Sequence, residues 1–506
     1  MSSIELDLRK GMYPIDVEAR ESSSGVDHQI AQPRMERRFH RWQMVGFSCT
    51  IMITWEGLLF VFTYGLENGG PAGLVYGYLF CWIGYLAVVL SLAELVSMMP
   101  NAAGQYFWVG TLAPPQYRKF LSWMTGWQQF LAWQADIASA AYLASEVLLG
   151  LVNLNIPSYV PKGWQVTLVL YAIMLFALAF NTVLIRFLPH VEWIILVIHI
   201  VGFIVIAVPV TYFAKHNTAS EVFTTLLTLG DYSAGTSFFV GLMTSVFAFL
   251  GADGAIHMCE EVDKPEVEVP KSLVHSITIN GFLGFGMMLI MLFCIGDVQD
   301  ALNSPTGFPF IQIFQQALPN SIAFTTGLAS LLLVLLVSAV VAVTAAASRV
   351  TWAFARDDGL PGSSYLKKID DRAKLPIWSI TLSFVVTLLL GLINVGSATA
   401  FNAVISLMVA SYLASYLPPI ALLAWKRWTK QGLQMGRWHL GRFGLATNIA
   451  AIVWTTIVFL FSFWPTTSSV TLQTMNWAVL LWGGSFVLGC LLYIRQRNWF
   501  RTPAIA

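Results

Sequence analysis

The sequence predicts an all-α integral membrane protein with twelve transmembrane helices. Of its 506 residues, 57% are apolar and 11% are charged, whereas soluble domains carry roughly 25% charged residues. A bilayer core requires about 20 predominantly apolar residues per helix, and twelve segments of the chain meet that rule. They lie at about 46–66, 73–99, 120–151, 165–187, 190–213, 236–258, 273–296, 322–354, 376–395, 400–425, 444–464 and 475–494.

The segments that flank these spans predict the topology. Residues 1–44 are polar and lack the apolar core of a signal peptide, so we expect a disordered cytosolic tail before a membrane domain at 45–495. The segments on the expected outer side hold only Lys162 and Lys215, and almost all other Lys and Arg residues lie on the other side. Because positively charged loops stay in the cytosol, we expect both termini, including the short tail 496–506, to be cytosolic.

Two spans are interrupted near mid-membrane by polar residues and glycine. The interruption in span one reads Thr54-Trp55-Glu56-Gly57, and that in span six reads Gly251-Ala252-Asp253-Gly254. Backbone groups freed inside a bilayer must be received by protein or by a water-filled cavity. Matched broken helices in two halves are typical of inverted-repeat transporters, where they form the substrate site. We therefore predict a five-plus-five inverted repeat, about 45–215 and 235–425, with peripheral helices at about 444–494.

Three titratable residues lie in or beside these interruptions. Glu56 is a carboxylate near mid-membrane, where a charge costs at least ~2.5 kcal/mol on insertion scales, so it should face a partner or a cavity. We expect it either to bind a substrate amine or a coupling proton, or to make a structural hydrogen bond. Asp253 either contacts the amine or caps the helix that resumes after it. His257 shares its face and serves either proton coupling or structure.

Aromatic and polar residues of three spans are candidate walls of the pocket. Trp55, Phe247 and Phe249 either hold an ammonium group through cation–π attraction or pack as ordinary apolar side chains. In span three, Trp133 and Asp136 are three residues apart and therefore lie on one helical face. Asp136 is expected either to line the pathway or to bond to a neighbouring helix.

Three stretches of the chain carry a family pattern. The first joins Asn68-Gly69-Gly70-Pro71, Ala93-Glu94 and Pro100–Tyr106, the second is Phe247–Lys271, and the third runs from Ser348-Arg349 to Pro361. Over about residues 40–495 the chain therefore resembles the amino acid–polyamine–organocation (APC) superfamily. Within it, the chain is similar to the fungal amino acid/choline transporter family, which includes GABA and choline permeases.

The resemblance implies the APC fold and a substrate site between the breaks of spans one and six, flanked by spans three, eight and ten. The family often has a Gly-x-Gly pair at the first break, whereas this chain has one glycine there, Gly57. The resemblance also favours an inner gate of ion pairs, in which Glu260 and Glu261 meet the region of Arg349, over a solvated loop at these glutamates. The plasma membrane is the location that the family implies.

These observations predict a secondary active transporter of an amino acid or related amine, such as GABA, choline or a polyamine, that works by proton-coupled alternating access. A transporter of a specialised metabolite or its amino-acid-like precursor, and a non-translocating nutrient sensor, are the alternatives. The chain has no P-loop motif, no nucleophile with its base, and five cysteines without paired spacing. We expect no enzyme activity, cofactor, metal or nucleic-acid partner. The sequence does not specify the substrate, the direction of transport or the oligomeric state.

Overall fold

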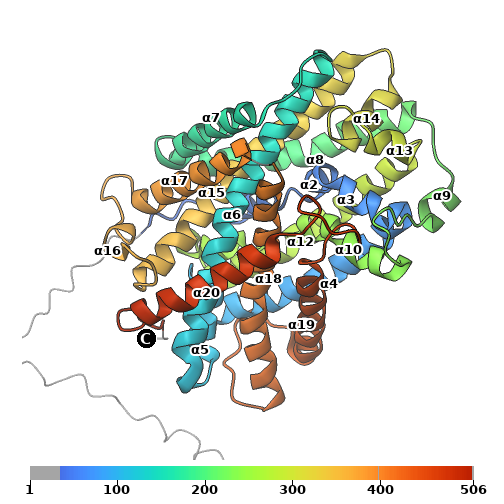
Figure 1. Cartoon of the computed structure of the whole chain (residues 1–506). Coiled ribbons are helices and arrows are strands. Elements are labelled where there is room, and N and C mark those ends of the chain that lie inside the picture. The colour runs from blue at the N-terminus through green and yellow to red at the C-terminus, as the bar shows by residue number, and fades with distance from the viewer. Residues whose placement is uncertain (1–34, 397, 504–506) are drawn as a thin grey trace, which may run out of the picture.

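The computed structural model describes residues 35–396 and 398–503, whose regular structure is helical apart from two isolated β-bridges (Figure 1). Within this part of the chain, eleven helices are long and apolar enough to cross a membrane, which confirms the predicted all-α membrane protein. The predicted sixth span is represented by a shorter apolar helix of 14 residues, α10 (Ala234–Phe247). The count of twelve spans and the inverted repeat therefore stay predictions.

The first half of the chain forms helices α1 to α8. Their bounds are α1 (Arg41–Met52), α2 (Thr54–Phe60), α3 (Phe62–Glu67), α4 (Gly70–Met98), α5 (Gln105–Leu112), α6 (Pro115–Asn155), α7 (Gly163–Thr182), the 3-10 helix η1 (Ile185–Phe187) and α8 (Leu188–Phe213). Helix α6 has 41 residues and packs on α5 and α7 as well as on two helices of the second half, α15 and α18. It therefore joins the two halves at the centre of the molecule.

The second half repeats the pattern of long helices with short surface helices between them. Besides α10, the bounds are α9 (Ala219–Thr224), α11 (Gly254–His257), η2 (Cys259–Glu261), α12 (Pro265–Phe293), α13 (Val298–Leu302), α14 (Pro309–Ala317), α15 (Ile322–Arg356), α16 (Ser363–Leu366), α17 (Ile377–Gly396), α18 (Ala398–Trp428), η3 (Gly441–Phe443), α19 (Gly444–Phe461) and α20 (Ala478–Gln496). Helix α20 is the least buried of the long helices, as a peripheral helix should be.

Both ends of the described chain lie on one face of the molecule, which we call the terminal face. The guanidinium of Arg38 donates to the carbonyl oxygen of Ala373 (3.0 Å), and the amide of Arg501 donates to the carbonyl oxygen of Asp357 (2.9 Å). Both acceptors belong to the connection between α15 and α17. Helices α9, α13 and α14 lie together on the opposite face (Figure 1).

The N-terminal tail ends earlier than residue 44, which corrects the predicted boundary. Helix α1 already begins at Arg41. Before it, Phe39 pairs with Val262 in a parallel bridge and is buried in the core. Burial of this aromatic side chain anchors the chain against the segment that follows α11, whereas the rest of the predicted tail, 1–34, lies outside the described residues.

The first helix break lies at Ile53 and not at Thr54–Gly57, which corrects the position predicted for this break. Ile53 has φ 34° and ψ 49°, a left-handed conformation that is an outlier for a β-branched residue. Thr54, Trp55, Glu56 and Gly57 belong to helix α2, and Val61 separates α2 from α3. The break was predicted at Thr54–Gly57 because glycine can adopt positive φ values. Gly57, however, has a helical conformation and does not interrupt the helix.

The second break extends from Ala248 to Asp253, so it begins three residues before the predicted interruption at Gly251–Gly254, and Gly254 already belongs to α11. The amides of Phe249 and Leu250 bond back three residues, to Val246 and Phe247, so the ordinary i→i−4 ladder of α10 is not continued. Gly251 has φ +76°, a conformation that glycine adopts without steric cost. The chain then resumes as the single turn α11.

The two breaks face each other across the centre of the molecule. A Cβ atom built on Gly251 would lie 2.5 Å from Cγ2 of Ile51, and one on Gly254 would lie 2.4 Å from Cδ1 of the same residue. Gly57 lies beside Phe247 and Ala248 on the other side of the first break. The absence of a side chain at Gly251 and Gly254 therefore allows the two broken helices to touch.

Candidate functional site

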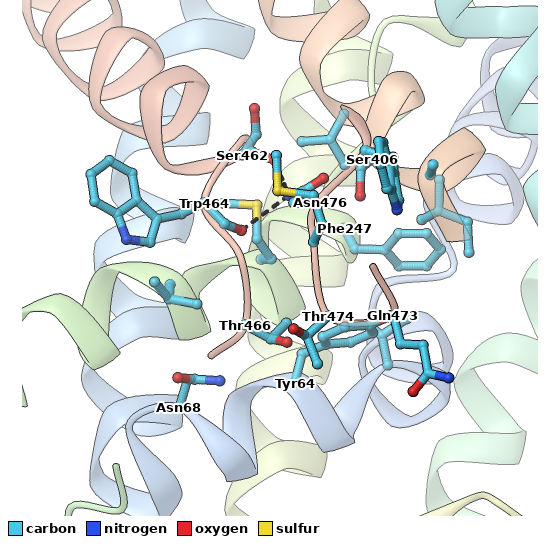
Figure 2. Close-up of a pocket in the computed structure, with 18 residues that line it drawn as sticks. Tyr64, Asn68, Phe247, Ser406, Ser462, Trp464, Thr466, Gln473, Thr474 and Asn476 are labelled. Atoms are coloured by element: carbon cyan, nitrogen blue, oxygen red, sulfur yellow. Dashed lines mark hydrogen bonds between the residues drawn. The ribbon is translucent and has the colours of Figure 1, made fainter. Parts of the chain in front are cut away.

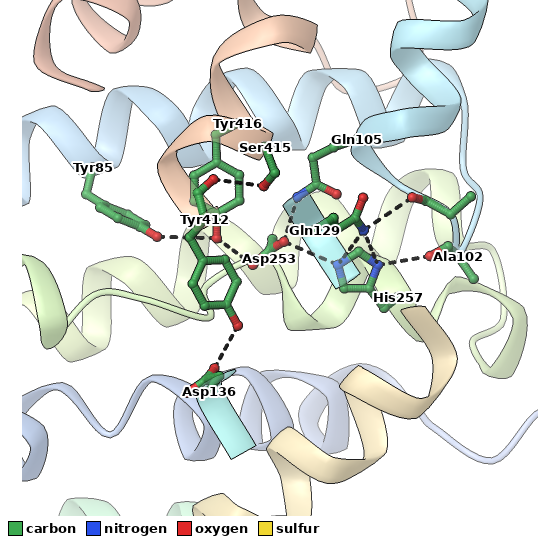
Figure 3. Close-up of polar contacts among 11 residues, drawn as sticks. Tyr85, Ala102, Gln105, Gln129, Asp136, Asp253, His257, Tyr412, Ser415 and Tyr416 are labelled. Carbon is green, nitrogen blue, oxygen red and sulfur yellow. Dashed lines mark hydrogen bonds and ion pairs between the residues drawn. The ribbon is translucent and has the colours of Figure 1, made fainter. Parts of the chain in front are cut away.

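Asp253, in the second break, is buried and is held by three other residues (Figure 3). Its Oδ1 accepts a hydrogen bond from the hydroxyl of Tyr416 on α18 (2.7 Å). Its Oδ2 accepts from the amide of Gln105 on α5 (2.5 Å) and lies 3.2 Å from Nε2 of His257 on α11. Asp253 makes no capping hydrogen bond with its side chain. The structure thus contradicts the capping alternative and gives Asp253 partners on three helices.

His257 completes a closed polar pair with Asp253. Its Nδ1 lies 2.9 Å from the carbonyl oxygen of Ala102, and the side-chain amide of Gln129 lies against the ring. A carbonyl oxygen and an ionised carboxylate are both acceptors only, so an ionised Asp253 requires a proton on each nitrogen of His257. The two residues thus form a buried, hydrogen-bonded carboxyl–imidazole pair in which each of the four polar side-chain atoms has a partner.

Asp136 and Trp133 of α6 adjoin the same break. Oδ2 of Asp136 accepts from the hydroxyl of Tyr412 on α18 (2.7 Å), and a Cβ atom on Gly251 would lie 3.7 Å from it. Trp133 meets His257 and Tyr412 edge-on, with ring centroids 5.4 Å apart in both cases. Although it lies at the middle of α6, Asp136 keeps part of its surface exposed. Its side chain therefore lies directly beside the second break.

Glu56 lies in a different environment from Asp253. It is buried, and its Oε1 lies 2.7 Å from Nδ1 of His199, which is also buried, on α8. Oε2 of Glu56 and Nε2 of His199 have no hydrogen-bond partner among the described residues. The structure therefore does not join Glu56 and Asp253 in one cluster. Thr54, two residues before Glu56, is likewise buried with an unpartnered hydroxyl.

The three predicted pocket aromatics lie in three surroundings. Trp55 packs against His199 (5.8 Å between ring centroids) and Phe203 of α8. Phe249 is buried and stacks on Tyr85 of α4, with ring centroids 5.9 Å apart. Ala252, in the same break, is also buried.

Phe247 borders a cavity of about 250 Å³ (Figure 2). Asn68, another lining residue, pairs with Thr228 in the segment that follows α9, so the cavity lies toward the opposite face. The cavity is enclosed by α3, α10, α18 and the connection between α19 and α20, and none of its eighteen lining residues is charged. The hydroxyl of Tyr232 donates to the carbonyl oxygens of Pro465 (3.2 Å) and Thr467 (2.8 Å). These bonds hold the α19–α20 connection over the cavity. Of the predicted substrate-binding residues, Phe247 alone lines this cavity.

The terminal face is closed by ion pairs between α15 and the segment after α11. Nε of Arg349 bonds to Oε1 of Glu261 (2.8 Å), and both side chains are buried. Arg356 bonds to Oε1 of Glu260 (2.6 Å) and to Oδ1 of Asn101 (3.1 Å). The structure thus brings together the predicted gate residues Glu260, Glu261 and Arg349.

Asp357, directly after α15, adds a further contact at this closure. It accepts a hydrogen bond from the hydroxyl of Tyr106 (2.8 Å). Burial raises the pKa of the Asp357 carboxyl, against the opposing effects of the Arg356 charge and the Tyr106 hydroxyl. Together with the two ion pairs, this bond connects α15 to α5 and to the second break.

The sequence comparison matches the amino acid permease family over residues 39–485. The match covers both helix breaks, the Asp253 cluster and the ion pairs of the terminal face. The chain belongs to the amino acid permease family. It is accordingly a multi-pass membrane transporter of amino acids or amines, and not an enzyme.

Three fungal relatives are similar to this chain over most of their length. A choline transporter of Saccharomyces cerevisiae is 29% identical over 484 residues, which cover 95% of this chain and 84% of the relative. Amino-acid permease 2 of Neurospora crassa is 28% identical over 477 residues, covering 93% and 87%. A protein of Macrophomina phaseolina with the provisional name amino acid/polyamine transporter is 30% identical over 441 residues, covering 86% and 96%.

The sequence analysis did not identify several residues that contact Asp253, Asp136 and Glu56. His199 lies in the middle of the fifth predicted span, and an ionisable residue at that depth was a usable signal. Tyr412 and Tyr416 are four residues apart and place two hydroxyls on one face of α18, but tyrosine is also a common packing residue. Gln105 carried no separate signal, because its partner Asp253 lies 148 residues away.

Proposed function

We propose that this permease is a secondary active, proton-coupled transporter of a small amine or amino acid, and that its substrate binds between the two helix breaks. The proposed binding residues are those predicted from the sequence in or beside the breaks and on α6. They are Thr54, Trp55, Glu56, Gly57, Trp133, Asp136, Phe247, Phe249, Gly251, Ala252 and Asp253. Within this set we assign the contact with the substrate amine to Asp136.

The observation that carries this assignment is that only one oxygen of the Asp136 carboxylate is hydrogen-bonded, in a residue that is only partly buried. Both oxygens of Asp253 are already bonded to Tyr416, Gln105 and His257, whereas Oδ1 of Asp136 is not bonded to any described residue. The ring of Trp133, on the same face of α6, supplies an aromatic surface for an ammonium group. The amine then binds next to Gly251, where the second break exposes its backbone.

We further propose a five-plus-five inverted repeat of twelve spans with alternating access. The ion pairs of Glu261–Arg349 and Glu260–Arg356 close the terminal face in the state described here, and the cavity beside Phe247 is the approach from the opposite face. Breaking the two ion pairs opens the other side. With the termini in the cytosol, the cavity is the external approach, and the plasma membrane is the proposed location.

Two alternatives share much of this framework. Transport of a specialised metabolite with an amine group uses the same carboxylate and aromatic ring, and a substrate screen separates it from amino acid transport. A nutrient sensor binds at the same residues without translocation. Vesicle uptake distinguishes the sensor from a transporter, because a sensor accumulates no label.

The test is reconstitution of the full-length protein in vesicles with labelled choline, GABA, arginine and spermidine, with and without an imposed pH gradient. We expect saturable uptake of at least one compound and stimulation by a proton gradient directed with transport. Asp136→Asn should raise KM by about 10–100-fold, the equivalent of the ~1.5–3 kcal/mol of a hydrogen bond to a charged group.

Glu146→Gln is the matched control, because Glu146 lies on the same helix and is also partly buried. It should leave KM within about twofold of the wild-type value, a change of well under 1 kcal/mol. An unchanged KM in Asp136→Asn contradicts the assignment of the amine. Failure to accumulate any of the four compounds under a pH gradient contradicts the proposed transport function for these substrate classes.

A further inference from the structure

The chain that follows α20 returns to the terminal face and packs against the end of α15. We call residues 499–503 of this segment the strap. It begins with a turn, in which the amides of Trp499 and Phe500 both bond to the carbonyl oxygen of Gln496 (2.9 Å each). The strap then runs to α5, beside which the described chain ends (Figure 1). A segment beyond the last helix is poorly ordered unless contacts tie it down, and the strap has such contacts.

Phe500 anchors the strap in the apolar core. It is only 2% exposed, and its ring centroid lies 6.0 Å from that of Phe354 on α15. Phe354 is itself enclosed, because its ring meets that of Tyr106 on α5 (5.3 Å between centroids). A Cβ atom built on Gly126 or Gly359 would lie 2.6 or 2.4 Å from the Phe354 ring. The strap therefore packs on a side chain that is tightly held while the terminal face is closed.

The residues after Phe500 fasten the strap to α15 and to α5. The backbone amide of Arg501 donates to the carbonyl oxygen of Asp357 (2.9 Å), and the side-chain Nε of Arg501 lies 3.4 Å from Oδ2 of Asp358. A Cβ atom built on Gly110 of α5 would lie 3.0 Å from the carbonyl oxygen of Pro503. The strap thus connects the end of α15 with α5.

The strap crosses the same closure as the ion pairs of the terminal face. Arg356, which pairs with Glu260, lies between Phe354 and Asp357, the residues at the end of α15 that the strap contacts. The other end of the strap rests on α5, the helix whose Tyr106 bonds to Asp357. An opening that carries the end of α15 away from α5 must therefore detach the strap from one of these helices.

The strap is attached weakly enough to be released. The Arg501 side chain is 80% exposed, so its ion pair with Asp358 is screened by solvent and contributes little. Trp499, directly before Phe500, is 64% exposed. A cavity of about 520 Å³ lies between the strap and the chain that follows α15. One buried aromatic ring therefore supplies most of the attachment, as is suitable for a segment that binds and releases.

We propose that the strap is an autoinhibitory lock that holds the terminal face closed until Phe500 is withdrawn. The inference rests on the proposed alternating access, to which it adds a second fastening of one face. With Phe500 in place, both the ion pairs and the strap must yield before α15 moves. With Phe500 withdrawn, the ion pairs hold α15 without the strap, and the population shifts toward molecules with an open terminal face.

Cys259 is a native reporter of this opening and needs no substrate. Its thiol is buried directly before Glu260, in the segment that the ion pairs hold. Full-length protein in lipid nanodiscs is treated with N-ethylmaleimide, and the labelling of each cysteine is followed by mass spectrometry. We expect Phe500→Ala to raise the labelling rate of Cys259 about tenfold, the equivalent of a ~1.4 kcal/mol shift in the opening equilibrium.

Three references accompany this measurement. Cys294 is buried between α12 and α13, toward the opposite face, and should label at the wild-type rate. Trp499→Ala is the matched control, because it removes an exposed aromatic ring of the same strap, and Cys259 labelling should stay within about twofold of wild type. Arg356→Gln calibrates the reporter, since loss of the ion pair with Glu260 should also raise Cys259 labelling.

Arg501→Glu is a second variant, which leaves the core intact. The new carboxylate faces Asp357 and Asp358, so like charges repel the strap from the end of α15. We expect Cys259 labelling to rise about threefold, the equivalent of a surface ion pair. If Phe500→Ala does not fold, this variant decides the test.

Unchanged Cys259 labelling in Phe500→Ala, together with an increase in Arg356→Gln, overturns the proposal. An equal increase at Cys259 and Cys294 also overturns it, because that result means general loosening of the fold. If Arg356→Gln leaves Cys259 protected, both the lock and the proposed alternating access are contradicted. If the labelling follows our expectation but the wild-type protein transports none of choline, GABA, arginine and spermidine, the lock stands and the proposed transport function is contradicted.

Discussion

The two buried carboxylate–imidazole pairs of the described chain differ in how completely they are bonded. In the pair Asp253–His257, each carboxylate oxygen and each ring nitrogen has a partner. In the pair Glu56–His199, one carboxylate oxygen and one ring nitrogen have none. Each pair includes a residue in or just after one of the two helix breaks, so the same combination of side chains occurs twice near the centre of the membrane.

The difference shows which pair is held more firmly. In the fully bonded pair, any movement of a member breaks several hydrogen bonds, and a bond to a charged group is worth about 1.5–3 kcal/mol. The half-bonded pair, Glu56–His199, is held by the single bond between its members. The Asp253 pair therefore fixes the geometry of the second break more firmly than the Glu56 pair fixes α2 against α8.

The largest expected effect that tests this comparison is on stability. Asp253→Asn replaces a carboxylate that accepts from Tyr416, Gln105 and His257 by an amide with one acceptor oxygen. More than one buried bond is then lost, so the cost should exceed the about 1.5–3 kcal/mol of a single bond to a charged group. Glu56→Gln leaves an amide that still bonds to Nδ1 of His199, so we expect a change below about 1 kcal/mol. The measurement is the apparent melting temperature of the full-length protein in detergent, with size-exclusion chromatography as the readout of the folded fraction.

An equal loss of stability in these two variants contradicts the distinction between the pairs. Asp253→Glu serves as the control for charge, since it keeps the carboxylate but displaces it by one methylene. It should lie between Asp253→Asn and the wild type, because the ion pair survives with strained packing.

A smaller effect is expected when one bond is taken from the closed pair. Tyr416→Phe removes the hydroxyl that donates to Oδ1 of Asp253, at a cost of about 1.5–3 kcal/mol. The variant leaves Oδ1 of Asp253 without this donor, so the pair resembles the half-bonded pair, in which Oε2 of Glu56 has no partner. The apparent melting temperature of the full-length protein in detergent provides the measurement.

Tyr85→Phe is the matched control for this change. Tyr85 is buried next to Tyr416, but its hydroxyl reaches the Tyr416 hydroxyl only at 3.5 Å, which is at the limit of a hydrogen bond. We expect Tyr85→Phe to lose less stability than Tyr416→Phe. If Tyr85→Phe and Tyr416→Phe behave alike, packing rather than bonding to Asp253 explains both.

The sequence alone predicted the positions of the long helices, but it did not predict which residues pair with the buried carboxylates. Apolar length predicted the long helices to within a few residues, as for span three at 120–151 and α6 at Pro115–Asn155, because each helix satisfies its own backbone bonds in lipid. The carboxylates Glu56, Asp136 and Asp253 were identified by their cost at mid-membrane. Their partners, such as His199 and Tyr416, come from helices distant in sequence, and no local periodicity specifies which helices meet.

The positions of the two breaks were also only partly predictable from the glycines in the sequence. Both were predicted from glycine beside a carboxylate, and the prediction was right at Gly251 and wrong at Gly57. At Gly251 the backbone has φ +76° and a Cβ atom would meet Ile51. At Gly57 the residue is helical and a Cβ atom would lie 3.8 Å from its nearest neighbours, an ordinary contact.

The smallest expected effect follows from this contrast and has the opposite sign to the others. Gly57→Ala should stabilise the protein by about 0.5–1 kcal/mol, because alanine is favoured over glycine inside a helix and the site has room for the methyl group. Gly251→Ala should destabilise it, since a left-handed backbone alone costs a non-glycine residue roughly 1–2 kcal/mol. The two melting temperatures must therefore move in opposite directions. A loss of stability in Gly57→Ala means that the first break includes Gly57 after all, and that the hinge next to Glu56 begins later than Ile53.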